Sequence, residues 1–167
     1  SIDMCLFVNG IPFITIELKN QLTGQNIGDS EKQYKENRNP EGEIFLKYKR
    51  LAAYFCVDND NLSLTTKLNG YKTRFIPFNK AINNPGVEKD YKSSFFWKEI
   101  LKPESVLDIL ENFTHVSYEE EVFYDKTTKE ISNKINEKII FPRYHQLDLI
   151  RKIKNDIIEF GVGKNYL

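Results

Sequence analysis

The apolar positions near the start of the chain follow the two-residue period of β-strands. Residues 3–8 and 13–19 are largely apolar and lie on either side of Asn9-Gly10, a dipeptide typical of tight hairpin turns. Successive side chains of a strand point to opposite faces, so each run can bury one face. The pattern therefore predicts two antiparallel strands joined at Asn9-Gly10.

Two more strands are indicated further along. Residues 51–57 are continuously apolar and end at the turn-forming run 58–61, which is typical of a strand buried on both faces. Residues 62–68 alternate between apolar and polar, which predicts a strand with one buried face. Residues 69–94 are polar and rich in turn-forming residues, so we expect a loop there.

Three segments follow the helical period instead: residues 26–37, 95–113 and 142–160. Pro103 is well placed to begin a helix within the second segment. We expect part of the apolar stripe of the third to stay exposed in this chain. Residues 117–140 alternate charged with isolated apolar residues and predict a linker that could hold a weak hairpin. Together these elements predict an α/β fold with a mixed sheet.

The composition is that of an ordinary globular domain. The chain has 167 residues, with 24 basic and 24 acidic side chains and a formal net charge of zero. No window approaches the roughly 18 apolar residues of a membrane span. A neutral chain that binds DNA must do so through a local basic patch. Cys5 and Cys56 lie in apolar runs and are expected to be buried free thiols, and two histidines without a cysteine cluster give no zinc-site pattern.

The clearest candidate chemistry lies at the end of the second predicted strand. Glu17 and Lys19 are two positions apart, so they share one face of the strand, while Ile16 and Leu18 point into the core. By itself, an acid and an amine at this spacing is usually a solvated ion pair. A second carboxylate on the same face would favour a functional site over a solvated ion pair.

Whether Asp3 supplies that carboxylate depends on the hairpin loop. With a two-residue loop at Asn9-Gly10, Asp3 would face Ile16 and lie on the wrong side of the sheet. A three-residue loop or a bulge places Asp3 opposite or diagonal to Glu17, at about 4.5–8 Å. The same change gives the hairpin one apolar and one polar face, so we expect an odd loop or a bulge.

Two carboxylates and an amine on one face can hydrolyse a phosphodiester. A hard cation held by Asp3 and Glu17 would activate water and neutralise charge on the phosphate. The Lys19 ammonium could orient the water or stabilise the pentavalent state. Carboxylate oxygens suit Mg²⁺ rather than zinc, so Mg²⁺ is the expected cofactor.

The segment from Asp3 to Asn20, with its Ile16-Glu17-Leu18-Lys19-Asn20 core, resembles the endonuclease region of the R subunit of type I restriction enzymes. Those subunits are DNA-translocating motors with an N-terminal nuclease of the PD-(D/E)xK type. Further stretches similar to that family are Lys32-Gln33-Tyr34-Lys35, Val57-Asp58 with Thr65-Thr66, Thr73-Arg74-Phe75 with Pro77-Phe78-Asn79-Lys80, and Phe141-Pro142-Arg143-Tyr144-His145-Gln146-Leu147-Asp148. The resemblance therefore spans nearly the whole chain and implies a restriction-endonuclease-like sheet flanked by helices.

The resemblance implies roles for the strand residues. Asp3 and Glu17 would be the metal ligands and catalytic carboxylates, with the Leu18 carbonyl as a further metal ligand. Lys19 would be the catalytic lysine.

The resemblance also implies that the helix after this strand flanks the site through Gln33 and Tyr34. Many relatives have Gln four residues before the tyrosine, where this chain has Ser30. The family's usual Pro before the first Asp is Ile2 here.

Basic residues around the site are candidate DNA contacts: Lys35, Arg38, Lys49, Arg50 and Arg74. The run 47–50 interleaves basic residues with an aromatic one and could follow a phosphate backbone. A solvated entrance to the next strand explains the same run equally well.

The end of the chain resembles the entrance to the ATPase motor of R subunits. In the full-length protein only, Arg143, Tyr144 and Gln146 would lie near the adenine of ATP. The run 161–164 is not a Walker A motif, because it lacks the spacing and the Ser or Thr. We therefore expect an endonuclease domain at 1–116 whose upstream part is missing, a linker at 117–141, and the start of the motor domain at 142–167.

The function implied by the resemblance is metal-dependent, non-sequence-specific cleavage of double-stranded DNA, triggered by ATP-driven translocation. The implied partners are double-stranded DNA and the methyltransferase and specificity subunits, with no membrane, in the cytoplasm of a bacterium or archaeon. The isolated chain is expected to be inactive. The alternative is a non-catalytic scaffold that docks the motor to the methyltransferase.

Overall fold

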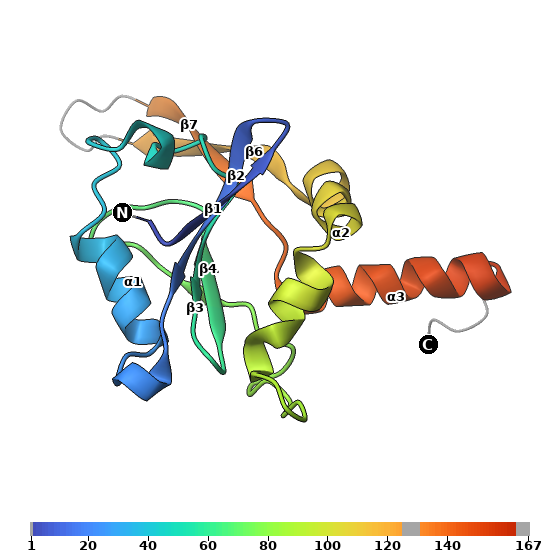
Figure 1. Cartoon of the computed structure of the whole chain (residues 1–167). Coiled ribbons are helices and arrows are strands. Elements are labelled where there is room, and N and C mark those ends of the chain that lie inside the picture. The colour runs from blue at the N-terminus through green and yellow to red at the C-terminus, as the bar shows by residue number, and fades with distance from the viewer. Residues whose placement is uncertain (1, 125–130, 163–167) are drawn as a thin grey trace.

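The computed structural model describes residues 2–124 and 131–162, and a mixed five-stranded sheet forms its centre (Figure 1). The strands lie in the order β1-β2-β3-β4-β5, with the bounds Met4–Val8, Ile11–Leu18, Ala53–Val57, Leu62–Thr65 and Ile76–Pro77. β2 and β3 are parallel, because helix α1 (Ile27–Glu36) connects them, and every other neighbouring pair is antiparallel. The predicted α/β class and mixed sheet are confirmed.

The hairpin β1-β2 contains both a tight turn and a bulge. Asn9 and Gly10 form a two-residue loop with φ of 49° and 79°, as turns of the hairpin-forming type require. The register shifts between Leu6 and Phe7, so that Phe13 has no partner on β1. Beyond the bulge Met4 pairs with Ile16, and the same register continued by one residue sets Asp3 opposite Glu17. The expectation of a bulge is confirmed, whereas a three-residue loop is not what the chain uses.

Each face of the sheet carries its own core. On the face of α1, a small cluster is built from Tyr34, Leu46, Leu51, Tyr54, Cys56 and Leu68. On the opposite face, a larger cluster is rich in aromatic rings, and the ring of Phe55 lies 4.8–5.7 Å from those of Phe78, Phe96 and Phe141. This two-sided burial accounts for the continuous apolar run of β3.

The larger cluster is covered by the segment after β5 and by the end of the chain. Phe96–Ile100 and Ile109–Phe113 are π-helical segments on either side of α2 (Pro103–Asp108), which begins at Pro103 as expected. Figure 1 shows α1 on one side of the sheet, with α2 and α3 (Tyr144–Phe160) on the other. The segment 69–94, which was predicted to be a loop, contains the short strand β5. This strand was not predicted, because two residues are too few to show the alternation of apolar and polar positions that marks a strand.

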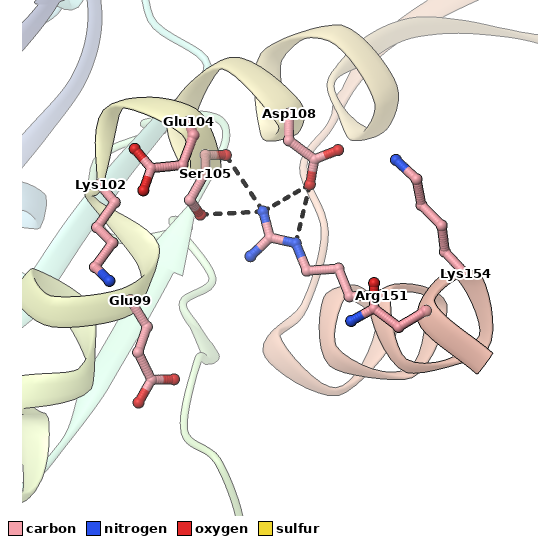
Figure 2. A pocket seen from close by; sticks show the side chains of 8 residues that line it. Glu99, Lys102, Glu104, Ser105, Asp108, Arg151 and Lys154 are labelled. Atoms are coloured by element: carbon pink, nitrogen blue, oxygen red, sulfur yellow. Dashed lines mark hydrogen bonds and ion pairs between the residues drawn. The ribbon is translucent and has the colours of Figure 1, made fainter. Parts of the chain in front are cut away.

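Helix α3 is tied to α2 by an arginine. The Arg151 guanidinium donates to the Asp108 carboxylate at 2.7 and 2.9 Å, and to the hydroxyl and carbonyl oxygens of Ser105 at 3.0 and 3.3 Å (Figure 2). At its start, α3 buries Tyr144 and Leu147 in the larger cluster. Further along, Ile150 and Phe160 are about half exposed, which confirms that part of the stripe stays uncovered.

The segment predicted as a linker forms a two-stranded ribbon of β6 (His115–Tyr124) and β7 (Ile131–Ile140), so its hairpin is regular rather than weak. The Tyr48 hydroxyl anchors the ribbon by donating to the Glu137 carbonyl at 2.8 Å and accepting from the Ile139 N–H at 3.2 Å. The ribbon's residues 125–130 lie outside the described residues, as do the last residues of the predicted motor segment, 163–167. Across the described ranges, none of the helices is long and apolar enough to cross a membrane.

Candidate active site

Glu17 lies fully buried near the end of β2, on the face that α1 covers. Its Oε1 accepts a hydrogen bond from Arg38 Nε at 2.8 Å and pairs with a second nitrogen of the same guanidinium. Its Oε2 is also buried and has no hydrogen-bond partner among the described residues. Burial raises the pKa of Glu17 and outweighs the lowering effect of Arg38. One oxygen of this carboxylate is therefore fixed, and the other is unused.

Asp3 supplies the second carboxylate. Its Oδ2 accepts a hydrogen bond from the Leu18 N–H at 2.8 Å, which ties the start of the chain to the end of β2. After burial and the opposing effect of Arg38, the nearby Asp3 carboxylate is a further cause of the raised pKa of Glu17. The two acids thus share one face of the hairpin, because the bulge inserts one extra residue between them and shifts the register. Asp3 itself is exposed.

Lys19 and helix α1 complete the arrangement. Lys19 Nζ donates to Gln33 Oε1 at 2.6 Å, and the buried Ser30 hydroxyl donates to the Glu17 carbonyl oxygen at 3.1 Å. Tyr34 lies in the smaller core, where its hydroxyl donates to Thr15 Oγ1 at 3.0 Å. Gln33 and Ser30 therefore contact the site directly, and Tyr34 supports the strand that carries it.

The way α1 is fixed also depends on a residue that sequence reasoning left in a turn. Asp58 is buried after β3, and its carboxylate accepts from the N–H groups of Ile27, Asp60 and Asn61 at 2.7–3.0 Å. One of these donors belongs to the first turn of α1, where backbone N–H groups have no partner within the helix. Asp58 thereby positions the start of α1 beside the site.

The donor set at the hairpin fits a small hard cation. The unused Oε2 of Glu17 and the exposed carboxylate of Asp3 are oxygen ligands, the type that Mg²⁺ prefers. Within the described ranges, no three side chains of His, Cys, Asp or Glu gather as a metal cluster. Mg²⁺ keeps several water ligands, so two carboxylates suffice for it, whereas a closed zinc site needs more protein ligands.

Burial also decides the state of the thiols. Both cysteines are free; Cys56 is buried and Cys5 is half-buried. Burial raises the pKa of Cys56 to about 12, so this thiol stays protonated at neutral pH and packs as an apolar side chain.

The structure separates the five residues predicted as DNA contacts. Arg38 is not on the surface, because its side chain is only 7% exposed and is engaged with Glu17; this corrects the sequence interpretation. Lys35 lies over the ring of Phe75, and Lys49 pairs with Glu137. The remaining two, Arg50 and Arg74, are exposed. The burial of Arg38 against Glu17 could not be predicted, because a contact between residues far apart in the chain leaves no periodic pattern in the sequence.

The three residues predicted to approach ATP surround the start of α3. Tyr144 is buried in the larger cluster, with its ring 5.2 Å from that of Phe95. Gln146 Oε1 caps the helix by accepting from the Arg143 N–H at 3.0 Å, and both side chains are exposed. In this chain, Tyr144 is therefore a packing residue.

Comparison with known protein families identifies the family of this chain. The family described as the N terminus of type I restriction enzyme R proteins matches residues 1–84, which include α1 and all five strands of the sheet. The chain belongs to this family. Within the family match lie Asp3, Glu17, Lys19 and Arg38, together with the buried Asp58. No curated protein and no solved structure matches the chain.

Proposed function

We propose that this domain is the metal-dependent nuclease of a type I restriction enzyme R subunit, and that it cleaves double-stranded DNA without sequence specificity. The observation that carries the proposal is the unused, buried Oε2 of Glu17 beside the carboxylate of Asp3. A buried polar atom without a partner is costly, so such atoms mark places where a ligand is expected. Family membership and the neighbouring Lys19 support the same conclusion.

The residues of the chain divide the work. Asp3 and Glu17, with the Leu18 carbonyl as a further ligand, would hold Mg²⁺, which supplies an activated water and neutralises charge on the phosphate. Arg38 holds the Oε1 of Glu17, so that only the other oxygen is free to face the cation. The hydrogen bond from Leu18 orients Asp3 toward the same point.

Lys19 is suited to the phosphate rather than to the metal. An ammonium has three N–H donors, and Gln33 accepts one of them. Two donors remain to orient a water or to stabilise the charge that develops on the phosphate in the transition state. Gln33 limits the motion of this long side chain, which would otherwise lose rotamer entropy when substrate binds.

In the complete enzyme, this site would act together with a motor and with separate subunits for methylation and sequence recognition. ATP would be used by the motor of the full-length protein. Cleavage by this domain would therefore follow translocation, and recognition of the DNA sequence would lie elsewhere.

The experiment compares Lys19→Ala with a matched lysine variant in the R subunit assembled with its methyltransferase and specificity subunits. With Mg²⁺, ATP and plasmid DNA, Lys19→Ala should lose cleavage by about 10²-fold or more, because an electrostatic contact to the transition state is removed. Its rate of ATP hydrolysis should be unchanged. Lys32→Ala is the control, because Lys32 is an exposed lysine of α1 whose side chain makes only a 4.0 Å contact with Glu36.

Asp3→Ala and Glu17→Ala should behave like Lys19→Ala. If all three variants cut DNA at the rate of the unmodified enzyme, the nuclease proposal fails. The non-catalytic scaffold would then be the better description, and the same variants should be tested for loss of complex assembly.

A further inference from the structure

A hollow of about 220 Å³ opens beside Lys19, where β2 and β3 end. Three segments form its walls: residues 18–20 at the end of β2, residues 57–59 at the end of β3, and the segment 91–97 before α2, which contributes Tyr91, Ser93 and Trp97. Lys19 lies in both the hollow and the candidate active site. Any ligand in the hollow is therefore next to the proposed scissile phosphate.

Two aromatic side chains line this hollow and remain accessible. Tyr91 is 54% exposed and Trp97 is 37% exposed. The Trp97 ring is not loose, because it packs edge-on against the buried ring of Phe96, with the ring centroids 5.1 Å apart. Exposed aromatic surface gathered at one hollow is characteristic of a binding site rather than of ordinary surface.

The aromatic wall is fixed relative to the wall that carries Lys19. Both the N–H and the hydroxyl of Ser93 donate to the Asn59 carbonyl oxygen at 3.1 Å. Lys92 pairs with Asp60 at 3.3 Å in the same turn. The amide of Asn59 in turn donates to Asn20 Oδ1 at 3.4 Å. These contacts hold the hollow open in a defined shape before any ligand arrives.

The electrostatics of the hollow favour an anionic ligand with a flat apolar part. Lys19 provides the positive charge, and the side chains of Asn20 and Asn59 provide polar groups. The acid in the lining, Asp58, is buried, and three backbone N–H groups already occupy its carboxylate. A purely apolar partner would shield the Lys19 ammonium from water while only Gln33 accepts from it, which is unfavourable.

We propose that this hollow binds one unstacked nucleotide of a single DNA strand, with its base on Trp97 and Tyr91 and its phosphate at Lys19. The inference rests on the proposed nuclease function only in identifying the ligand as DNA. Base stacking on aromatic side chains tolerates any sequence, because every base has a π-face. A stacking site here would separate the strand from its duplex partner next to the bond that is cut.

Trp97 is the single tryptophan of the chain, so its fluorescence reports on the hollow directly. The 167-residue chain is titrated with a thymidine oligonucleotide of about ten nucleotides, a length within the range of single-strand sites. The buffer contains Ca²⁺ in place of Mg²⁺. The expected result is saturable quenching. A blunt duplex of the same length should quench much less, because its bases are already stacked.

Variants locate the binding. Tyr91→Ala should weaken oligonucleotide binding by about 5- to 150-fold, the loss expected when one base–aromatic stack is removed. Trp97→Ala should do the same when binding is followed through a label on the oligonucleotide. Tyr71→Ala is the matched control, because Tyr71 is an exposed tyrosine that does not line the hollow, and its binding should be unchanged.

The absence of quenching, or quenching that Tyr91→Ala leaves unaltered, would overturn the proposal. So would equal binding of duplex and single strand. If no nucleic acid binds but Trp97→Ala prevents assembly with the partner subunits, the hollow is a protein-docking site and the proposal is wrong. Quenching by DNA in a protein whose full complex never cleaves would refute the nuclease function alone. Normal cleavage by a Trp97→Ala, Tyr91→Ala double variant would refute the hollow alone.

Discussion

The substitution Arg38→Met tests the central contact of the candidate site. Arg38 and Glu17 form an ion pair whose side chains are 7% and 0% exposed. Methionine keeps an unbranched apolar side chain in the same space but removes the charge and the hydrogen bonds. The ionised carboxylate of Glu17 would then be buried without a counter-ion.

The expected loss of stability is large. Removing one partner of a buried ion pair typically costs about 3–5 kcal/mol, because the remaining charge is desolvated and uncompensated. Breaking an exposed pair such as Lys152 with Asp148 should cost far less, because water screens both charges. In the double variant Arg38→Met, Glu17→Gln no charge is left behind, so most of the loss should be recovered.

The pH dependence of this loss has a definite sign. Burial already raises the pKa of Glu17, with Arg38 opposing it, so losing Arg38 raises this pKa further. A raised carboxyl pKa makes the folded state take up protons, so its stability falls as the pH rises from the ordinary value toward the folded value. The difference between the variant and the unmodified chain should therefore be greatest at neutral pH and should shrink on acidification.

Urea unfolding followed by circular dichroism at neutral and mildly acidic pH measures these differences, and Arg74→Met serves as the control. Arg74 is exposed, so its loss should change the free energy of unfolding by less than about 0.5 kcal/mol. The reasoning is refuted if Arg38→Met costs less than about 1 kcal/mol at neutral pH. It is also refuted if the double variant is no more stable than the single one. Mg²⁺ should stabilise Arg38→Met more than the unmodified chain, because the arginine no longer competes for Glu17.

Three further substitutions test how the fold is supported, the first two by urea unfolding and the third by limited proteolysis. Gly10→Val should destabilise the chain by roughly 1–2 kcal/mol, because φ is 79° in the turn and a side chain is strained at that angle. No neighbour lies within 4 Å of the added Cβ, so this backbone strain is the whole expected cost. Tyr34→Phe should cost about 1–3 kcal/mol, since it leaves the buried Thr15 hydroxyl without its donor. Arg151→Ala should loosen α3 and speed its proteolysis. Burial acts to raise the pKa of Asp108, but its hydrogen bonds, led by the one from Arg151, outweigh burial and lower this pKa below its ordinary value. The contact with Arg151 should therefore persist above the ordinary pKa of Asp and be lost as the pH falls through the lowered value.

The sequence by itself determined the elements that have a strong local period. The alternation on either side of Asn9-Gly10, the continuous run of β3 and the helical stripe of α1 each depend only on neighbours in the chain. The placement of Asp3 and Glu17 on one face was also predictable, because one hydrophobic face and one polar face can coexist in the hairpin only with an extra residue. The bulge is the form that this extra residue takes.

What only the tertiary structure decided are contacts between residues far apart in the chain. Arg38 reads as a surface basic residue, yet it folds back from beyond α1 onto the acid of β2, 21 positions earlier. The hollow beside Lys19 likewise needs residues 18–20, 57–59 and 91–97 to meet, and their sequences carry no shared pattern. The ribbon β6-β7 is anchored by the Tyr48 hydroxyl and by the burial of Ile139, and neither contact follows from the ribbon's own sequence. Local periodicity records which face of an element is buried, but it contains no information on which distant side chain will cover that face.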